Sequence, residues 1–199
     1  MYSNYMVLEE TISVSEVFKE ELNLIKNDNL REFISICLDN APKYYLDVAA
    51  TSSGKHHPDF AQGRGGLVRH VKAAIAMAME LIRCELPSLG TFNQNQTDII
   101  ISALLMHDLF KFGMNDEPEG STNFMHPIYA AEFLAEQFDS YKNKALDLDV
   151  LEIGRCIESH MGKFNTDPKG ISDVELPKPR FPMEELVHLS DFVSSRKIY

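Results

Sequence analysis

The chain has 199 residues, of which 44% are hydrophobic and 25% are charged, so it is long enough to enclose one large core without cross-links. Its 30 acidic and 19 basic residues give a net charge of −11 at pH 7. Such a surface repels polyanions, because affinity for nucleic acid rests largely on Lys and Arg side chains that neutralise phosphates. The composition therefore argues against a protein that binds long nucleic acid by itself.

Helical periodicity dominates the chain, and the alternation typical of strands is rare. We predict an all-α fold in which residues 1–199 form a single domain, a compact bundle of about six or more helices. The predicted helices span residues 14–39, 66–85, 96–112, 127–139, 147–161 and 182–197. Residues 1–50 form an N-terminal helical segment that either covers the core or provides the face of a homodimer.

Three of the predicted connections are long: residues 51–65, 113–125 and 162–181. Long loops in a compact domain often bind ligands or cover a site. Each of these loops lies beside one of the candidate ligands described below, so we expect all three to border the site.

Three cysteines, Cys37, Cys84 and Cys156, are far apart and form no CxxC motif. All three stand in apolar helical surroundings, which predicts buried free thiols in a reducing compartment. The first residues, MYSNYMVLEE, lack the basic and apolar regions of a signal peptide, and the apolar runs are too short to span a bilayer. We therefore expect a cytoplasmic protein without a membrane segment.

The segment from Asp98 to Gly113, DIIISALLMHDLFKFG, leaves almost no polar face and should form a buried helix. His107 and Asp108 stand side by side within it. A buried carboxylate without a partner is costly or becomes neutral, and a divalent metal ion would satisfy both side chains. The alternative is a core histidine beside an aspartate that is hydrogen-bonded to a neighbouring helix, and the pair alone leaves both interpretations open.

Four other predicted helices each carry one coordinating side chain at the edge of an apolar stripe. These side chains are His70, His126, His160 and Asp191. One such residue is usually structural, but five helices that each offer one favour a shared metal site.

In chain order these residues read H…HD…H…H…D, and with this pattern residues 52–197 resemble the HD superfamily of metal-dependent phosphohydrolases. The sequence is most similar to the HD domain of OB-fold-bearing 3′–5′ exoribonucleases, through KHH followed by GGLVRH, ALLMHDLFK, ESHMG and a final HLSD. The chain departs from the pattern at Phe110, where many relatives have a glycine. Its first 50 residues read as helix rather than as an OB fold.

The resemblance implies a ligand set for two divalent ions. One ion would be held by His70, His107, Asp108 and Asp191. The second would be held by His126 and His160, with Asp108 as the bridging ligand. Mn, Fe, Co, Ni, Zn and Mg are all candidates, since metal availability often decides which ion such a site takes. Paired ions of this kind bind phosphate and activate water.

Several residues near these ligands have two interpretations. Lys111 follows the HD pair by one turn, so it either contacts a phosphate or is a cation that complements the helix dipole. His56 and His57 either bind substrate or are solvated loop residues. His188 either supports a ligand from the second coordination shell or is simply packed. Candidate phosphate contacts that are otherwise surface cations are Arg69, Lys72, Lys163 and Arg180.

The sequence therefore predicts a metal-dependent phosphohydrolase in which Asp108 and Lys111 are the catalytic residues. Its expected substrate is a small phosphorylated molecule, a nucleotide or a short oligonucleotide, cleaved at a phosphate ester by metal-activated water. Two alternatives lack turnover: a module that binds metal and nucleotide, and an accessory or interaction protein.

Overall fold

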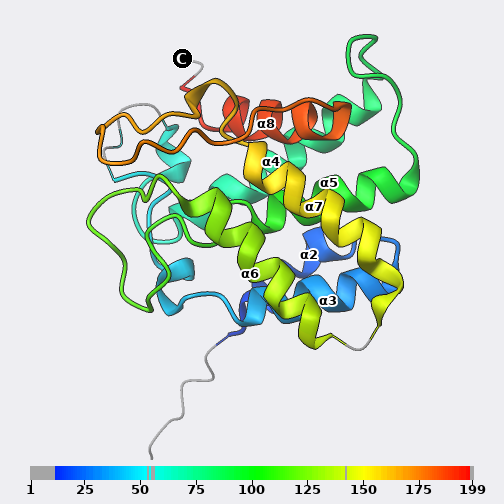
Figure 1. Cartoon of the computed structure of the whole chain (residues 1–199), viewed down its shortest axis with the longest axis horizontal. Coiled ribbons are helices and arrows are strands. Elements are labelled where there is room, and N and C mark those ends of the chain that lie inside the picture. The colour runs from blue at the N-terminus through cyan, green and yellow to red at the C-terminus, as the bar shows by residue number, and fades with distance from the viewer. Residues whose placement is uncertain (1–11, 53, 55–56, 142, 198–199) are drawn as a thin grey trace, which may run out of the picture.

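The computed structural model describes residues 12–52, 54, 57–141 and 143–197, and this part of the chain is all-helical (Figure 1). Its α-helices are α1 (Val14–Val17), α2 (Lys19–Leu22), α3 (Asp28–Asp39), α4 (Gly66–Arg83), α5 (Gln94–Met106), α6 (His126–Ser140), α7 (Asp147–Ser159) and α8 (Pro182–Ser194). Within the described residues there is no strand, and only an isolated antiparallel bridge joins Thr166 to Glu175. The predicted all-α class is confirmed.

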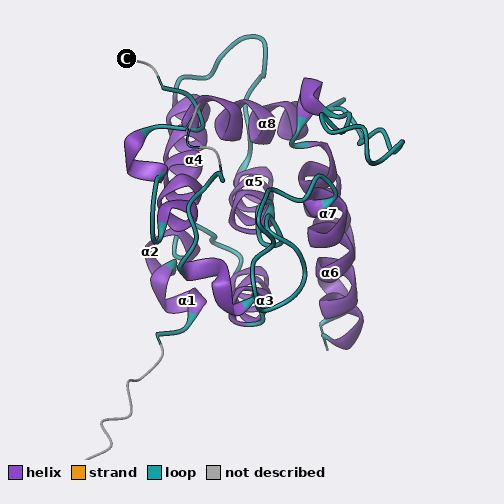
Figure 2. Ribbon diagram, turned by 90° about the vertical axis from the view of Figure 1, so that its left-hand side faces the viewer, coloured by secondary structure: helices purple, strands orange, loops and turns teal. Residues whose placement is uncertain are grey.

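Helix α5 is the centre of the molecule, because its sequence is apolar on every side. All residues from Thr97 to Met106 are buried. Helices α3, α4, α7 and α8 pack directly against α5, and α6 packs on the outside of α7. In Figure 2, α5 lies in the middle, with α4 on one side, α6 and α7 on the other, and α8 above.

The N-terminal segment forms three helices, so the prediction of one continuous helix over 14–39 is wrong. The chain turns between Leu22 and Asp28, and α1 lies against α3. The side chain of Asn27 caps α3 by accepting from the backbone N–H groups of Asn29 and Leu30. Apolar residues of this segment join the same core as the later helices: Phe18, Leu22, Ile25, Leu30, Phe33, Ile34, Cys37 and Leu38.

The carboxylate of Asp98 fixes this turn from the start of α5. Its Oδ2 accepts hydrogen bonds from the backbone N–H groups of Lys26 (3.0 Å) and Asn27 (2.9 Å), while its Oδ1 accepts from Gln94 Nε2 (2.7 Å). Asp98 is buried, so these bonds satisfy a carboxylate that would otherwise be costly to desolvate.

Helix α5 ends at Met106, six residues before the predicted end at 112. His107 is the C-cap, and the chain continues to Phe112 as successive turns, with hydrogen bonds from Leu109 N to Met106 O and from Lys111 N to Asp108 O. The HD pair therefore follows the helix rather than lying within it. Apolar side chains continue past the helix end because the turns remain in the core, which is why periodicity overestimates the helix.

Two of the three cysteines are buried free thiols, Cys37 and Cys156, as predicted. Burial raises the pKa of the Cys37 thiol to about 12. The prediction is wrong for Cys84, which is exposed because α4 ends at Arg83 and Cys84 is its C-cap. Among the described residues, no helix has both the length and the apolar character needed to cross a membrane.

We expect Asp98→Ala to lower the free energy of unfolding by about 2–4 kcal/mol, because it leaves backbone donors without an acceptor inside the protein. Chemical denaturation followed by circular dichroism measures the change. Asp39→Ala is the matched control: Asp39 also accepts from a backbone N–H, that of Ser15, but is exposed, so a loss below about 1 kcal/mol is expected. Equal losses for the two variants would contradict a special role for Asp98.

Candidate metal centre

All six predicted ligands meet in one place, brought there by the ends of five helices. His70 lies near the start of α4, His107 and Asp108 follow α5, His126 begins α6, His160 follows α7, and Asp191 lies near the end of α8. Five of the six are buried, and Asp191 is partly exposed. The proline after His126 suits the first turn of α6, where its missing N–H costs nothing.

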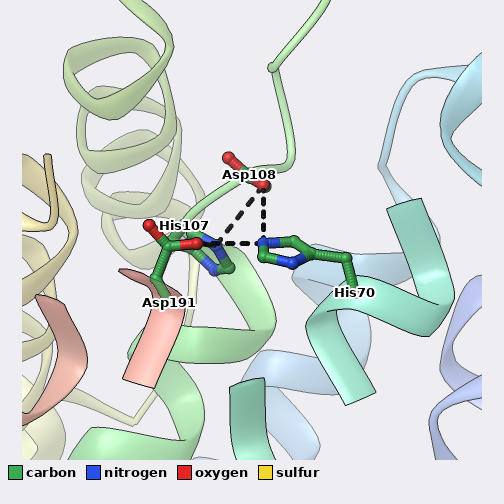
Figure 3. A group of neighbouring side chains, drawn as sticks. All are labelled: His70, His107, Asp108 and Asp191. Atoms are coloured by element: carbon green, nitrogen blue, oxygen red, sulfur yellow. Dashed lines mark ion pairs between the residues drawn. The ribbon is translucent and has the colours of Figure 1, made fainter. Parts of the chain in front are cut away.

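Four of these side chains form a first group, shown in Figure 3 pointing toward one another. His70 Nε2 lies 2.9 Å from Asp191 Oδ1 and 3.5 Å from Asp108 Oδ2. His107 Nε2 lies 3.4 Å from Asp108 Oδ2 and 3.6 Å from Asp191 Oδ1. One ligand atom from each residue lies within 4.8 Å of the others, so this group could hold a metal ion.

A second group consists of Asp108, His126 and His160, and it too could hold a metal ion. Asp108 Oδ1 lies 3.2 Å from His126 Nε2 and 4.0 Å from His160 Nε2. The two Nε2 atoms are 3.2 Å apart. Asp108 therefore belongs to both groups and offers a different carboxylate oxygen to each.

Three of the histidines are held in the same way. The Nδ1 atoms of His107, His126 and His160 lie 2.8, 2.7 and 2.8 Å from the backbone carbonyl three residues earlier. A carbonyl can only accept, so each Nδ1 carries a proton, and the lone pair of a neutral ring is then on Nε2. Such carbonyl contacts are the usual support for metal-binding histidines, and here they aim all three Nε2 atoms at the centre.

Both carboxylates of the centre are ionised. Burial by itself would raise the pKa of Asp108, but Lys111 and then His107 hold that pKa well below its usual value. Burial also acts to raise the pKa of Asp191, but the neighbouring imidazoles of His107 and His70 outweigh it, so this pKa is again well below normal. The negative charges are thus retained in the protein interior, where they attract a cation.

The pKa values of two histidines of the centre, His107 and His160, shift in opposite directions. Burial acts to lower the pKa of His107, but the carboxylate of Asp108 outweighs it and raises the pKa to about 10. Burial, followed by the neighbouring charge of His107, lowers the pKa of His160 to about 3. The ring that faces both carboxylates is thus the one whose pKa is raised, and the ring of His160 is the one whose pKa is lowered.

The residues present fit a divalent metal ion. His70 Nε2, His107 Nε2 and Asp108 Oδ1 are buried atoms without a hydrogen bond among the described residues. His126 and His160 present Nε2 atoms to each other while their Nδ1 protons are in use, so a proton or a metal ion has to lie between them. Imidazole nitrogen and carboxylate oxygen are the usual ligands of Zn, Fe, Mn, Co and Ni.

Lys111 is an ion-pair partner within the site. Its Nζ lies 2.5 Å from Asp108 Oδ2, the oxygen that Asp108 offers to the first group, and its side chain is buried. It also lines the cavity in front of the centre. The alternative interpretation of Lys111, a cation at the helix end that complements the dipole, does not fit, because α5 ends at Met106 and the Lys111 side chain is buried against Asp108.

A cavity of about 190 Å³ opens onto the centre. Asp108, His126, His160 and Asp191 line it, together with Lys111, whereas His70 and His107 are buried behind them. A second cavity of about 490 Å³ adjoins the first and shares Thr122, His126 and Met161 with it. Residues from all three long loops line these cavities, as we predicted from the positions of the loops.

His57 lines the first cavity, and its ring centroid lies 5.4 Å from that of His70. Burial, followed by the charge of Lys111, lowers the pKa of His57 to about 4, so the ring is neutral at pH 7. This location agrees with a substrate contact. The other histidine of the predicted pair, His56, lies outside the described residues.

His188 supports the site through the backbone. Its Nδ1 lies 2.7 Å from the carbonyl oxygen of His160, so it steadies the segment that carries a ligand. Gly162 makes room for this contact: it has φ of +55°, and a Cβ there would lie 2.3 Å from the His188 ring. We predicted that His188 either supports a ligand or is simply packed, and the predicted ligand whose backbone it contacts is His160.

Other candidates for phosphate binding do not line the cavity. Lys72 pairs with Glu21 at 2.6 Å, and Arg69 donates to the carbonyls of Phe60 and Gln62. Lys163 and Arg180 are also absent from its lining. One cation that we did not predict does line it: Arg196, just beyond α8.

The departure at Phe110 has a structural explanation. Its side chain is buried against α6, where its ring centroid lies 5.1 Å from that of Phe133 at an interplanar angle of 71°. Such edge-to-face pairs are favourable. The ring therefore anchors the HD turn to a neighbouring helix.

Comparisons with known proteins do not assign the chain to a family. A scan against protein-family models finds no match, and searches of curated proteins and of solved structures find none either.

We expect Gly162→Ala to lower the free energy of unfolding by about 1–3 kcal/mol, because alanine disfavours a positive φ and its Cβ displaces His188. Thermal denaturation measures the change. The matched control is Gly154→Ala in α7, where a Cβ meets nothing within 4 Å, so helix propensity should stabilise the protein by up to about 1 kcal/mol. If both substitutions stabilise the protein, the interpretation that Gly162 makes room for His188 is wrong.

Proposed function

We propose that this protein is a metal-dependent phosphohydrolase of the HD type that cleaves a phosphate ester of a nucleotide or a short oligonucleotide. The observation that carries the proposal is the position of Asp108. Its Oδ2 faces His70 and His107 and its Oδ1 faces His126 and His160, which is the arrangement expected of a carboxylate shared by two ions. Two like-charged ions need an anionic bridge, and an imidazole cannot provide one.

Metal ions and protein side chains would contribute different parts of the reaction. Paired divalent ions supply Lewis-acid activation of water and neutralise phosphate charge. The six ligand side chains from five helices would hold that charge in a buried position, where electrostatic interactions are stronger than in water. Lys111 lies at the cavity wall beside Asp108, so it is placed to bind a phosphate oxygen. His57, neutral and partly buried, is placed to contact the substrate.

The size of the site supports a substrate larger than a phosphate ion. The first cavity accommodates the reacting group, and the adjoining cavity provides room for the rest of the molecule. Its walls combine apolar side chains, Phe124, Met125 and Ile171, with hydroxyl and amide groups from the same loops. Such a mixed surface suits a sugar and a base.

The order of the ligands in the chain adds support from the sequence. His70, His107–Asp108, His126, His160 and Asp191 follow the order of the HD superfamily, and all six meet at one centre. The net charge of −11 disfavours long polyanions, so we expect mononucleotides and short oligonucleotides rather than long RNA.

One observation favours a second candidate, a module that binds metal and nucleotide without turnover. The contact of 2.5 Å between Lys111 and Asp108 Oδ2 places a protein cation where the first group would bind its ion. If this pair persists, Lys111 competes for the bridging carboxylate and only the second group binds metal strongly.

Metal stoichiometry tests the number of ions. We expect the purified protein to bind two Mn²⁺ or Fe²⁺ ions per chain, measured by elemental analysis after titration and desalting. The double variant His126→Ala/His160→Ala should bind one, because it loses the second group and keeps the first. His57→Ala is the control, since it lines the cavity but belongs to neither group, and should still bind two. A wild-type stoichiometry that never exceeds one would refute the two-ion site.

Kinetics separates the roles of two residues. We expect Asp108→Ala to abolish hydrolysis of p-nitrophenyl phosphate, of its bis-ester and of dinucleotides, because it removes the shared ligand. Lys111→Ala should retain the metal and lower kcat by about 10²–10³-fold, if the contact to phosphate strengthens in the transition state. An unchanged kcat would show that Lys111 does not act on the substrate. No hydrolysis by fully metal-loaded wild type would favour the binding module.

A further inference from the structure

Arg196 is held at the mouth of the candidate metal centre by two aromatic rings. Its guanidinium carbon lies 4.2 Å from the ring centroid of Phe192 and 5.5 Å from that of Phe164. The two rings are stacked on each other, with centroids 5.9 Å apart and an interplanar angle of 22°. Phe192 belongs to α8 and Phe164 to the loop over residues 162–181, so the pair joins two walls of the cavity.

Arg196 has no acidic partner in the part of the chain that the structure describes. Four other arginines pair with carboxylates, for example Arg64 with Asp47 at 2.6 Å and Arg83 with Glu80 at 2.9 Å, and Arg69 donates to backbone carbonyls. The Nε atom of Arg196 is buried and has no hydrogen-bond acceptor among the described residues. A buried donor without a partner is costly, so this guanidinium gains more than a solvated one from an anion that enters the cavity it lines.

The surroundings of Arg196 point to an anionic ligand. Both Lys111 and Arg196 line the cavity that contains Asp108 and the other candidate ligands. The charge of Lys111 is balanced by Asp108 at 2.5 Å, whereas no carboxylate of the described chain balances Arg196. In a chain with a net charge of −11, an unbalanced guanidinium beside a phosphate site is well suited to bind a second anion.

We infer that Arg196 binds a second phosphoryl group of the ligand whose first phosphoryl group lies at the metal centre. This inference rests on the proposed function and specifies its substrate class: molecules with two phosphoryl groups rather than simple monoesters. The rings of Phe192 and Phe164 contact the face of the guanidinium and leave its in-plane N–H donors for a phosphate. A guanidinium can donate to two phosphate oxygens at once, which an ammonium cannot do with the same fixed geometry.

The test compares two probes that the protein cannot hydrolyse: methylphosphonate, with one phosphoryl group, and methylenediphosphonate, with two. Both are titrated into metal-loaded, desalted full-length protein by calorimetry. We expect Arg196→Gln to weaken the binding of methylenediphosphonate about tenfold or more, and to leave the affinity for methylphosphonate within about twofold of wild type. Arg196→Lys should give an intermediate loss, because it keeps the charge but not the fork of donors.

Lys163→Gln is the matched control. Its Nζ lies 5.2 Å from the centroid of Phe164 and 5.3 Å from that of Phe192, so it contacts the same rings, but it does not line the cavity. This variant should bind both probes within about twofold of wild type. An equal loss in Lys163→Gln and Arg196→Gln would show that disturbed aromatic packing causes the effect, and would overturn the inference.

Metal analysis of the same samples separates this inference from the proposed function. If wild-type protein holds no metal, the proposed function is overturned, and the inference falls with it. If metal is bound and Arg196→Gln lowers the affinity for neither probe, or lowers both affinities equally, the inference alone is overturned. A loss of affinity for methylenediphosphonate alone, with unchanged metal content, supports the inference.

Discussion

The buried carboxylate of Asp108 is the interaction on which the arrangement of the centre depends. It is fully buried and ionised, and it contacts four histidines and a lysine that come from different parts of the chain. An isolated carboxylate in this position would cost several kcal/mol, so the fold is stable only if positive charge accompanies it. Within the protein, Lys111 and His107 provide that charge, and a metal ion can replace or join them.

Helix α5 explains how such a costly group can be placed so deeply. Its apolar sides pack against α3, α4, α7 and α8, and this burial supplies favourable free energy that offsets desolvation of the polar ends. Two aspartates bracket the helix. Asp98 at its start is satisfied by backbone donors of the N-terminal segment, whereas Asp108 just past its end pairs with Lys111 through Oδ2 and leaves Oδ1 without a hydrogen bond among the described residues.

Local sequence patterns predicted most of the helices and the residues that gather at the centre. They did not predict features that depend on contacts between residues far apart in the chain. Helix α6 begins at His126 and ends at Ser140, close to the predicted 127–139, because Pro127 marks its first turn and apolar periodicity marks its length. Periodicity placed the end of α5 too late, since it does not register the change to turns at His107. The hydrogen bonds from Lys26 and Asn27 to Asp98, and the contact of Phe164 with Arg196, join segments far apart in sequence, so no local pattern indicates them.

The distribution of the ligands over α4 to α8 has a consequence for how the protein is made. The first predicted ligand along the chain is His70 and the last is Asp191, so the six side chains can meet only after α8 has been made and has folded onto α4 and α5. A cation that needs all six side chains would therefore be held only by the completed domain.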